Sequence, residues 1–108
     1  MTRGILYVES RPRSPEVLAE YHAWYSDTHL REILGVAGFV SARRFAPVGD
    51  DGPFVAIYEI EADDLQAAVT SLREASARGE VRASDVMQLD PPPTIRLFET
   101  IATLPPPE

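Results

Sequence analysis

Cysteine is absent from the 108 residues of this chain. This absence excludes disulfide bonds, thiolate metal sites and cysteine nucleophiles. Lysine is also absent, so every basic side chain is an arginine. No apolar run approaches the roughly 20 residues that a membrane-spanning helix requires. Dinucleotide fingerprints, phosphate-binding glycine loops and serine-nucleophile motifs are missing as well, so the sequence gives no sign of the common nucleotide-binding and hydrolase classes.

Basic charge is scarce. The chain carries 17 acidic and 10 basic residues, which gives a net charge of −7. Phosphate binding depends on a surface rich in basic side chains, so this balance argues against nucleic acid and anionic membranes. The N-terminus enters a strand-like segment, residues 4–8, and lacks the apolar stretch and cleavage site of a signal peptide. We therefore expect a soluble cytoplasmic protein that binds neither nucleic acid nor membranes.

Length and hydrophobic content indicate one folded unit. Hydrophobic residues make up 44% of the chain, which is enough for a packed core. A chain of 108 residues suits one domain and is too short for two. We predict a single domain over residues 1–104, followed by a proline-rich tail over residues 105–108 that cannot continue a helix.

Hydrophobic spacing predicts the order of the secondary-structure elements. Short β-branched and aromatic runs predict strands over residues 5–8, 39–45, 54–60 and 95–101. Apolar residues at intervals of three and four predict helices over residues 15–29, 30–36 and 64–78. Ser14 and Asp63 are the expected N-caps, and Gly79 ends the last helix. The order strand, helix, strand, strand, helix, strand is the ferredoxin-like pattern, βαββαβ, of the α+β class.

This pattern predicts a four-stranded antiparallel sheet with the helices on one face. Regular alternation in the second strand places Phe39, Ser41, Arg43 and Phe45 on one face and Val40, Ala42 and Arg44 on the other. Both sets contain apolar side chains. Because burial contributes about 25 cal/mol per Å² of apolar area, leaving one face in water forfeits several kcal/mol. We therefore expect a second copy of the chain to cover that face.

The most informative stretch runs from Trp24 to Leu30. Tyr25 and His29 are four residues apart, so both lie on one side of a helix. Histidine can accept and donate protons near neutral pH, and it is the commonest general acid or base in enzymes. An arginine on the next strand, Arg43, can hold an enolate or another anionic oxygen. This combination indicates a site for a small molecule.

Several of the aromatic and charged residues have structural interpretations beside functional ones. Trp24 suits a core or dimer contact as well as a wall on which substrate stacks. Tyr7 and Tyr58 suit either the lining of the same cavity or the core. An arginine inside the sheet needs a partner, which Glu59 or Glu99 can supply. An internal pair of that kind is the alternative to ligand binding by Arg43.

The two histidines do not suggest a metal site. His22 and His29 lie seven residues apart, which is about 10 Å along a helix and too far for one ion. We therefore expect no metal and interpret His22 as a partly exposed structural residue. For His29, the alternative to a functional role is a hydrogen bond to the backbone at a helix end.

The sequence resembles the dimeric α+β barrel proteins, and most closely their EthD-like branch. The resemblance rests on the order of elements and on two runs, Trp24-Tyr25-x-x-x-His29-Leu30 and Gly38-Phe39-x-x-Ala42-Arg43-Arg44-Phe45. It implies a homodimer whose two sheets close into a barrel, with a cleft between helix and sheet in each subunit. The histidine of the EthD-like pattern falls on His29 and the preceding aromatic on Tyr25. Ala37 stands where such patterns often have proline, a departure that concerns the turn.

The superfamily includes polyketide cyclases, isomerases, monooxygenases without a bound cofactor and haem-binding enzymes, so the fold alone does not define the reaction. We expect a cofactor-independent enzyme that cyclises, dehydrates or isomerises a polyketide-like or aromatic molecule. In this hypothesis His29 is the general acid or base, Tyr25 donates to a substrate oxygen, and Arg43 anchors developing negative charge. Trp24, Tyr58 and Tyr7 complete the expected binding site. The alternatives are a cofactor-independent oxygenase of quinol-type aromatics, a non-catalytic binding or accessory protein, and a haem-binding protein.

Overall fold

The computed structural model of the chain describes residues 1–49 and 51–105. Within these residues, seven elements follow one another: β1 (Thr2–Ser10), α1 (Leu18–Trp24), α2 (Leu30–Leu34), β2 (Phe39–Phe45), β3 (Phe54–Ala62), α3 (Leu65–Ala77) and β4 (Thr94–Glu99). A 3₁₀ turn over Pro15–Val17 precedes α1, and a π-helical turn over Tyr25–His29 joins α1 to α2.

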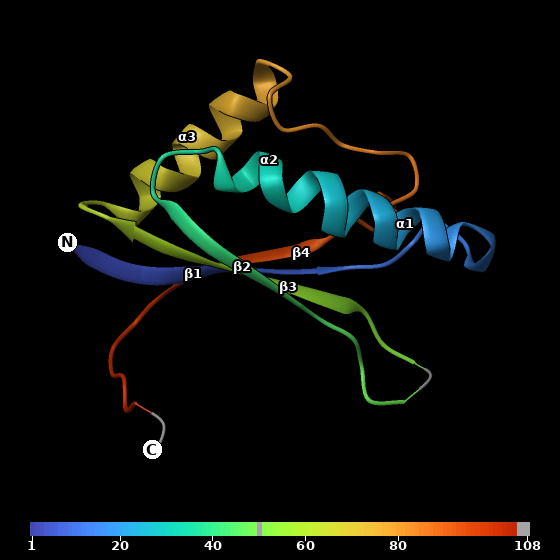
Figure 1. Cartoon of the computed structure of the whole chain (residues 1–108), viewed down its shortest axis with the longest axis horizontal. Coiled ribbons are helices and arrows are strands. Elements are labelled where there is room, and N and C mark those ends of the chain that lie inside the picture. The colour runs from blue at the N-terminus through green and yellow to red at the C-terminus, as the bar shows by residue number, and fades with distance from the viewer. Residues whose placement is uncertain (50, 106–108) are drawn as a thin grey trace.

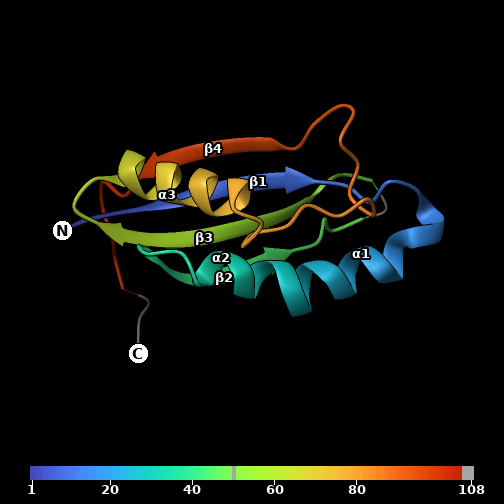
Figure 2. The ribbon, with the colours of Figure 1, turned by 90° about the horizontal axis from the view of Figure 1, so that it is seen from above.

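The strands form one sheet in the order β2-β3-β1-β4, and every neighbouring pair is antiparallel. All the helices cover the same face of this sheet, while the other face carries none (Figure 1). Figure 2 shows α1 and α2 following one another along one side of the sheet, with α3 beside them. The predicted α+β class with a four-stranded antiparallel sheet is confirmed, and the arrangement is compatible with the ferredoxin-like pattern.

Several predicted boundaries differ from the observed ones. The first strand is longer than residues 5–8, because β1 pairs with β3 along its whole length, from Thr2 opposite Ala62 to Ser10 opposite Phe54. The last strand covers residues 94–99 instead of 95–101. The N-cap of α3 is Asp64 and not Asp63, since the Asp64 carboxylate accepts from two backbone N–H groups of the first turn.

The first helical region does not break at His29 as the sequence suggested. The backbone stays helical from α1 through the π turn into α2, and it leaves the helix only after Leu34. The chain then turns at Gly38, whose φ of 97° is a left-handed conformation that favours glycine. His29 therefore lies inside a continuous helical segment and not at its end.

The prediction that side chains alternate regularly along β2 is wrong. Phe39 pairs with Ile60 and Ser41 with Glu59, so Val40 is an extra residue in a β-bulge between them. Beyond the bulge, Ala42 faces Tyr58 and Arg44 faces Ala56. The bulge puts Phe39 on the helix side together with Ala42 and Arg44, whereas Arg43 lies on the opposite face.

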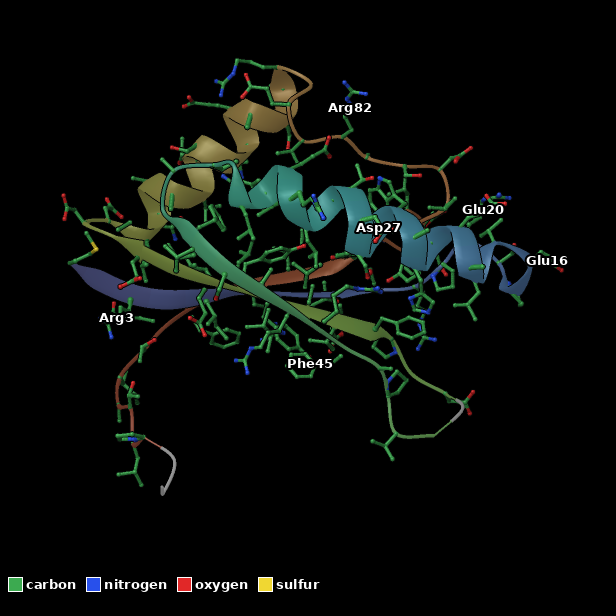
Figure 3. All side chains as sticks on the ribbon, viewed as in Figure 1. Arg3, Glu16, Glu20, Asp27, Phe45 and Arg82 are labelled. Carbon is green, nitrogen blue, oxygen red and sulfur yellow. The ribbon has the colours of Figure 1, made fainter. Side chains whose placement is uncertain are left out.

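The core lies between the helices and one face of the sheet. Tyr21, Tyr58 and Ile60 are among its largest completely buried side chains. The opposite sheet face, here called the open face, carries side chains that the helices do not cover: Ile5, Tyr7, Phe45, Val55, Ile57 and Phe98. Figure 3 shows Phe45 projecting from this face. Phe45 and Phe98 are 43% and 46% exposed.

The C-terminal segment leaves β4 on the side of the open face (Figure 1). Its apolar residues Ile101 and Leu104 are each 94% exposed. Residues 106–108 of the predicted proline-rich tail lie outside the described residues, as does Asp50 between β2 and β3.

Candidate functional site

A cavity of about 310 Å³ lies between the helices and the covered face of the sheet. Its walls are mostly apolar, and they include Leu6, Val8, Ile33, Leu72, Val81 and Ile95. Three of the residues predicted for the site line this cavity: Tyr25, His29 and Tyr58. The structure therefore brings the two expected catalytic side chains together with one expected binding residue, in the predicted position between helix and sheet.

The helical spacing and the π turn together align the site residues. Tyr21, Tyr25, His29 and Ile33 follow one another at intervals of four residues. Four residues exceed one α-helical turn of 3.6, so side chains at this interval drift around a regular α-helix. The wider turn over Tyr25–His29 reverses part of that drift. As a result the His29 ring stays against Tyr25, with the ring centroids 5.0 Å apart.

The His29 imidazole is held between aromatic rings. It stacks on Trp24 with a centroid distance of 4.5 Å and an interplanar angle of 25°. Its Nδ1 atom is buried and has no hydrogen-bond partner among the described residues. Burial lowers the pKa of His29 below its ordinary value, although the nearby Glu32 carboxylate and a hydrogen bond with the Arg82 backbone oppose the shift. The backbone contact is the structural alternative that the sequence left open for His29. The imidazole is therefore neutral at pH 7, and its Nδ1 atom makes no hydrogen bond to the described residues.

Two tyrosines that line the cavity carry hydroxyl groups that contact each other; Ser76 and Arg82 are further polar lining residues. The Tyr58 hydroxyl donates to the Tyr25 hydroxyl across 3.4 Å, and both rings are buried. Burial raises the pKa of both phenols, so each keeps its proton at neutral pH. Because Tyr25 accepts from Tyr58, its own proton can go to another acceptor, either the nearby Ser10 hydroxyl or a ligand oxygen. The pair can thus donate to one oxygen atom of a ligand in the cavity.

The segment between α3 and β4 closes the cavity. The sequence of residues 81–89 has no regular pattern that defines its structure. Val81, Arg82 and Met87 from this segment contribute to the wall. The segment is tied down at two places: the Arg82 N–H donates to the Glu32 carboxylate across 3.1 Å, and backbone bonds join residues 86–88 to residues 11–13. Figure 3 places Arg82 on this segment, on the side of the helices away from the sheet. No periodic pattern marks such a loop.

Two predicted binding residues do not join this site. Arg43 lies on the open face, where it pairs with Glu59 at 3.8 Å and covers the Phe45 ring. Tyr7 also lies on the open face, and its hydroxyl donates to Glu9 across 2.8 Å. The pairing of Arg43 with Glu59 is the structural alternative that the sequence left open. Trp24 takes an intermediate place, since it supports His29 without lining the cavity.

Of the two adjacent arginines, the sequence favoured Arg43 for the site, whereas the arginine that the structure places beside it is Arg44. It lies on the helix side of β2, and its guanidinium sits 4.5 Å from the centre of the Tyr25 ring. Because of the β-bulge at Val40, Arg44 lies on the same face of β2 as Phe39, and Arg43 lies on the opposite face. Regular alternation predicts the reverse. No alternation pattern reveals a bulge, so the sequence offered no signal that favoured Arg44.

Neither a metal centre nor a membrane span is found in the part of the chain that the structure describes. Residues 1–49 and 51–105 contain no group of three histidine or carboxylate side chains placed to hold one ion. None of the helices formed by these residues combines the length and the apolar character needed to cross a bilayer.

No protein-family model, curated protein or solved structure matches this chain. The likeness to the EthD-like branch therefore rests on the residues of the sequence itself.

We expect the free energy of unfolding to decrease as the pH is lowered from about 7.5 to about 5. Burial lowers the pKa of both His22 and His29 below the ordinary value of 6.5. The unfolded chain, with ordinary histidines, then binds more protons in this range. The contribution of the two neutral histidines to the free energy of unfolding is complete above pH 6.5. It is lost as the pH falls through 6.5 toward the lower pKa values of the folded chain.

Urea unfolding at several pH values measures this dependence. A variant with both His22→Gln and His29→Gln should lose most of it, because neither replacement titrates. An unchanged dependence in that variant would assign the effect to the carboxylates and not to the imidazoles.

Proposed function

We propose that this chain is a cofactor-independent enzyme that catalyses proton transfer on a compact, apolar molecule bearing a carbonyl or enol oxygen. One observation carries the proposal: a neutral imidazole and a bonded pair of tyrosines line the same, mostly apolar cavity. The imidazole of His29 is a base of suitable strength near pH 7. The Tyr25 hydroxyl is a donor for the oxygen on which negative charge develops.

The roles divide as follows. His29 takes a proton from the carbon next to the carbonyl, and the electrons of that C–H bond form the C=C bond of an enol or enolate. The carbonyl π electrons move to the oxygen, where the hydrogen bond from Tyr25 stabilises them. The protonated His29 then returns its proton to carbon or to a departing hydroxyl. Return at another carbon gives isomerisation, and loss of the hydroxyl as water gives dehydration.

The size of the cavity restricts the substrate. A volume of about 310 Å³ is at the lower end of the range for ligand sites, roughly 300–1,000 Å³. A molecule with one or two rings fits, and the apolar walls favour an aromatic or polyketide-like carbon skeleton. The resemblance to the EthD-like branch of the dimeric α+β barrels is consistent with such substrates.

We also propose that the active form is a homodimer joined through the open face, as in a dimeric α+β barrel. The support is the group of apolar side chains on this face, which includes the half-exposed Phe45 and Phe98; Arg43 and Glu59 lie among them as an ion pair. Burial of such side chains is worth about 25 cal/mol per Å². Light scattering at micromolar concentration is expected to give about twice the 11.9 kDa of one chain.

The proposed reaction can be tested with 1-tetralone, a two-ring aromatic ketone with acidic protons beside its carbonyl. In D₂O the protein should accelerate exchange of those protons, as followed by ¹H NMR. His29→Ala is expected to slow the enzymatic exchange by about 10²- to 10⁴-fold, the usual contribution of a general base. His29→Ala also removes the ring that stacks on Trp24, so circular dichroism must show that the variant is folded before its exchange rate is compared with that of wild type.

Tetralin, which lacks the carbonyl, is the matched control ligand. Tighter binding of 1-tetralone than of tetralin is expected from the Tyr25–Tyr58 pair. Binding of 1-tetralone without any acceleration of exchange would show a binding protein instead of an enzyme. Exchange that persists in His29→Ala at the wild-type rate would remove His29 from the mechanism.

A further inference from the structure

The Tyr25 ring lies next to a cation that does not line the cavity. The Arg44 guanidinium carbon is 4.5 Å from the Tyr25 ring centre, and it is also within 5.4 Å of Tyr21 and 6.0 Å of Phe54. Arg44 comes from β2 and is half-buried, whereas the two tyrosines come from the helical segment. Three aromatic rings therefore surround one cation beside the candidate site.

Two hydrogen bonds fix this guanidinium. One Arg44 nitrogen donates to the Ser26 hydroxyl across 2.9 Å and lies 3.2 Å from Nδ1 of His22. The His22 nitrogen must be unprotonated to accept from Arg44, and burial together with Arg44 lowers the pKa of His22, which favours that state. Among the residues that the structure describes, no carboxylate forms an ion pair with Arg44. The nearest groups to the Arg44 charge are therefore the aromatic rings and two neutral hydrogen-bond partners.

We propose that Arg44 is a positioning residue that acts through Tyr25 and makes its hydroxyl a stronger hydrogen-bond donor to the ligand oxygen. A cation over the face of a phenol attracts ring electrons, and this polarises the O–H bond. The hydrogen bond that Tyr25 accepts from Tyr58 acts in the same direction. Arg44 does not line the cavity, so it has no direct contact with a bound molecule.

This inference rests on the proposed function, because it assigns the donor for the carbonyl oxygen of that reaction. The proposed role also gives a reason for the position of Arg44, which lies against the helical segment with only neutral hydrogen-bond partners. Arg43, its neighbour in sequence, has a carboxylate partner and lies on the open face. The two arginines therefore serve different purposes, although they are adjacent in the chain.

The first test measures dissociation constants of 1-tetralone and tetralin for wild type, Arg44→Met and Arg44→Lys. Arg44→Met should weaken 1-tetralone binding by about 3- to 10-fold and leave tetralin binding unchanged. Arg44→Lys keeps a cation and should recover part of the loss. In a Tyr25→Phe background, Arg44→Met should have no further effect on either ligand. Arg73→Met, which removes an exposed arginine from α3, is the matched control and should behave as wild type.

The infrared carbonyl band of bound 1-tetralone gives a readout that a merely structural role would not change. A weaker hydrogen bond in Arg44→Met should move this band to higher frequency. Equal weakening of both ligands, or a loss that persists in the Tyr25→Phe background, would overturn the proposal and leave Arg44 with a packing role.

A second test needs no ligand. In protein labelled with ¹³C at the tyrosine Cζ atoms, the Tyr25 signal is assigned through its absence in Tyr25→Phe. Arg44 opposes the rise that burial causes in the pKa of Tyr25, so Tyr25 should ionise at higher pH in Arg44→Met than in wild type. An unchanged or lower titration would overturn the coupling. If 1-tetralone does not bind to wild type, the proposed function fails while this titration still decides the role of Arg44.

Discussion

Replacement of Tyr21 by alanine is expected to lower the free energy of unfolding by about 3–5 kcal/mol, the range for loss of a large buried side chain. Tyr21 is completely buried and packs edge-on against Tyr25 and obliquely against Phe54. Its hydroxyl also shares a buried hydrogen bond with Ser10. Urea unfolding followed by circular dichroism measures the change.

Tyr21→Phe is the matched control, because it keeps the ring and removes only the hydroxyl. This variant should lose about 1–3 kcal/mol, since the buried Ser10 hydroxyl is left without that partner. A loss below about 1 kcal/mol for Tyr21→Ala would mean that the helical segment does not pack on the sheet as described.

The second large effect concerns the open face. Ile57 lies near its centre, opposite Tyr7 on β1 and Arg43 on β2. A two-fold interface contains every substitution twice, so Ile57→Arg would bury two unpaired charges between the sheets. We expect the dissociation constant of the dimer to rise by about 1,000-fold or more, because each such charge costs several kcal/mol. Light scattering should then report a single chain of 11.9 kDa at concentrations at which wild type is a dimer.

Thr70→Arg adds the same charge on the exposed side of α3 and should leave the dimer intact. Circular dichroism of Ile57→Arg separates loss of the dimer from loss of the fold. A monomeric wild-type protein, or an Ile57→Arg variant that remains dimeric, would contradict the proposed interface.

Local spacing was sufficient to predict the α+β class and the proximity of Tyr25 and His29. Tyr25 and His29 were expected together because a four-residue interval keeps two side chains on one side of a helix. Of the two tyrosines that the sequence assigned either to the cavity or to the core, Tyr58 lines the cavity and Tyr7 does not. These predictions depend on contacts between neighbouring turns or neighbouring strands, which short sequence patterns describe well.

The remaining features depend on irregular backbone, which such patterns do not describe. Because Val40 is an extra residue, Phe39 shares a face of β2 with Arg44 and not, as expected, with Arg43. The π turn keeps the backbone helical at His29, where the sequence indicated a break. The loop that closes the cavity is held by single hydrogen bonds such as the one from Arg82 to Glu32, and it has no hydrophobic period.

Because of its bulge, β2 tolerates the loss of a residue at one position better than at the positions that follow. Loss of Val40 would place Phe39 and Ser41 next to each other, opposite Ile60 and Glu59, which are already adjacent. The pairing of every later residue in the strand would stay as it is. Loss of any one residue between Ala42 and Arg44 would instead turn the rest of the strand over. Lineages that descend from this sequence can therefore shorten β2 at one position without moving the guanidinium away from Tyr25.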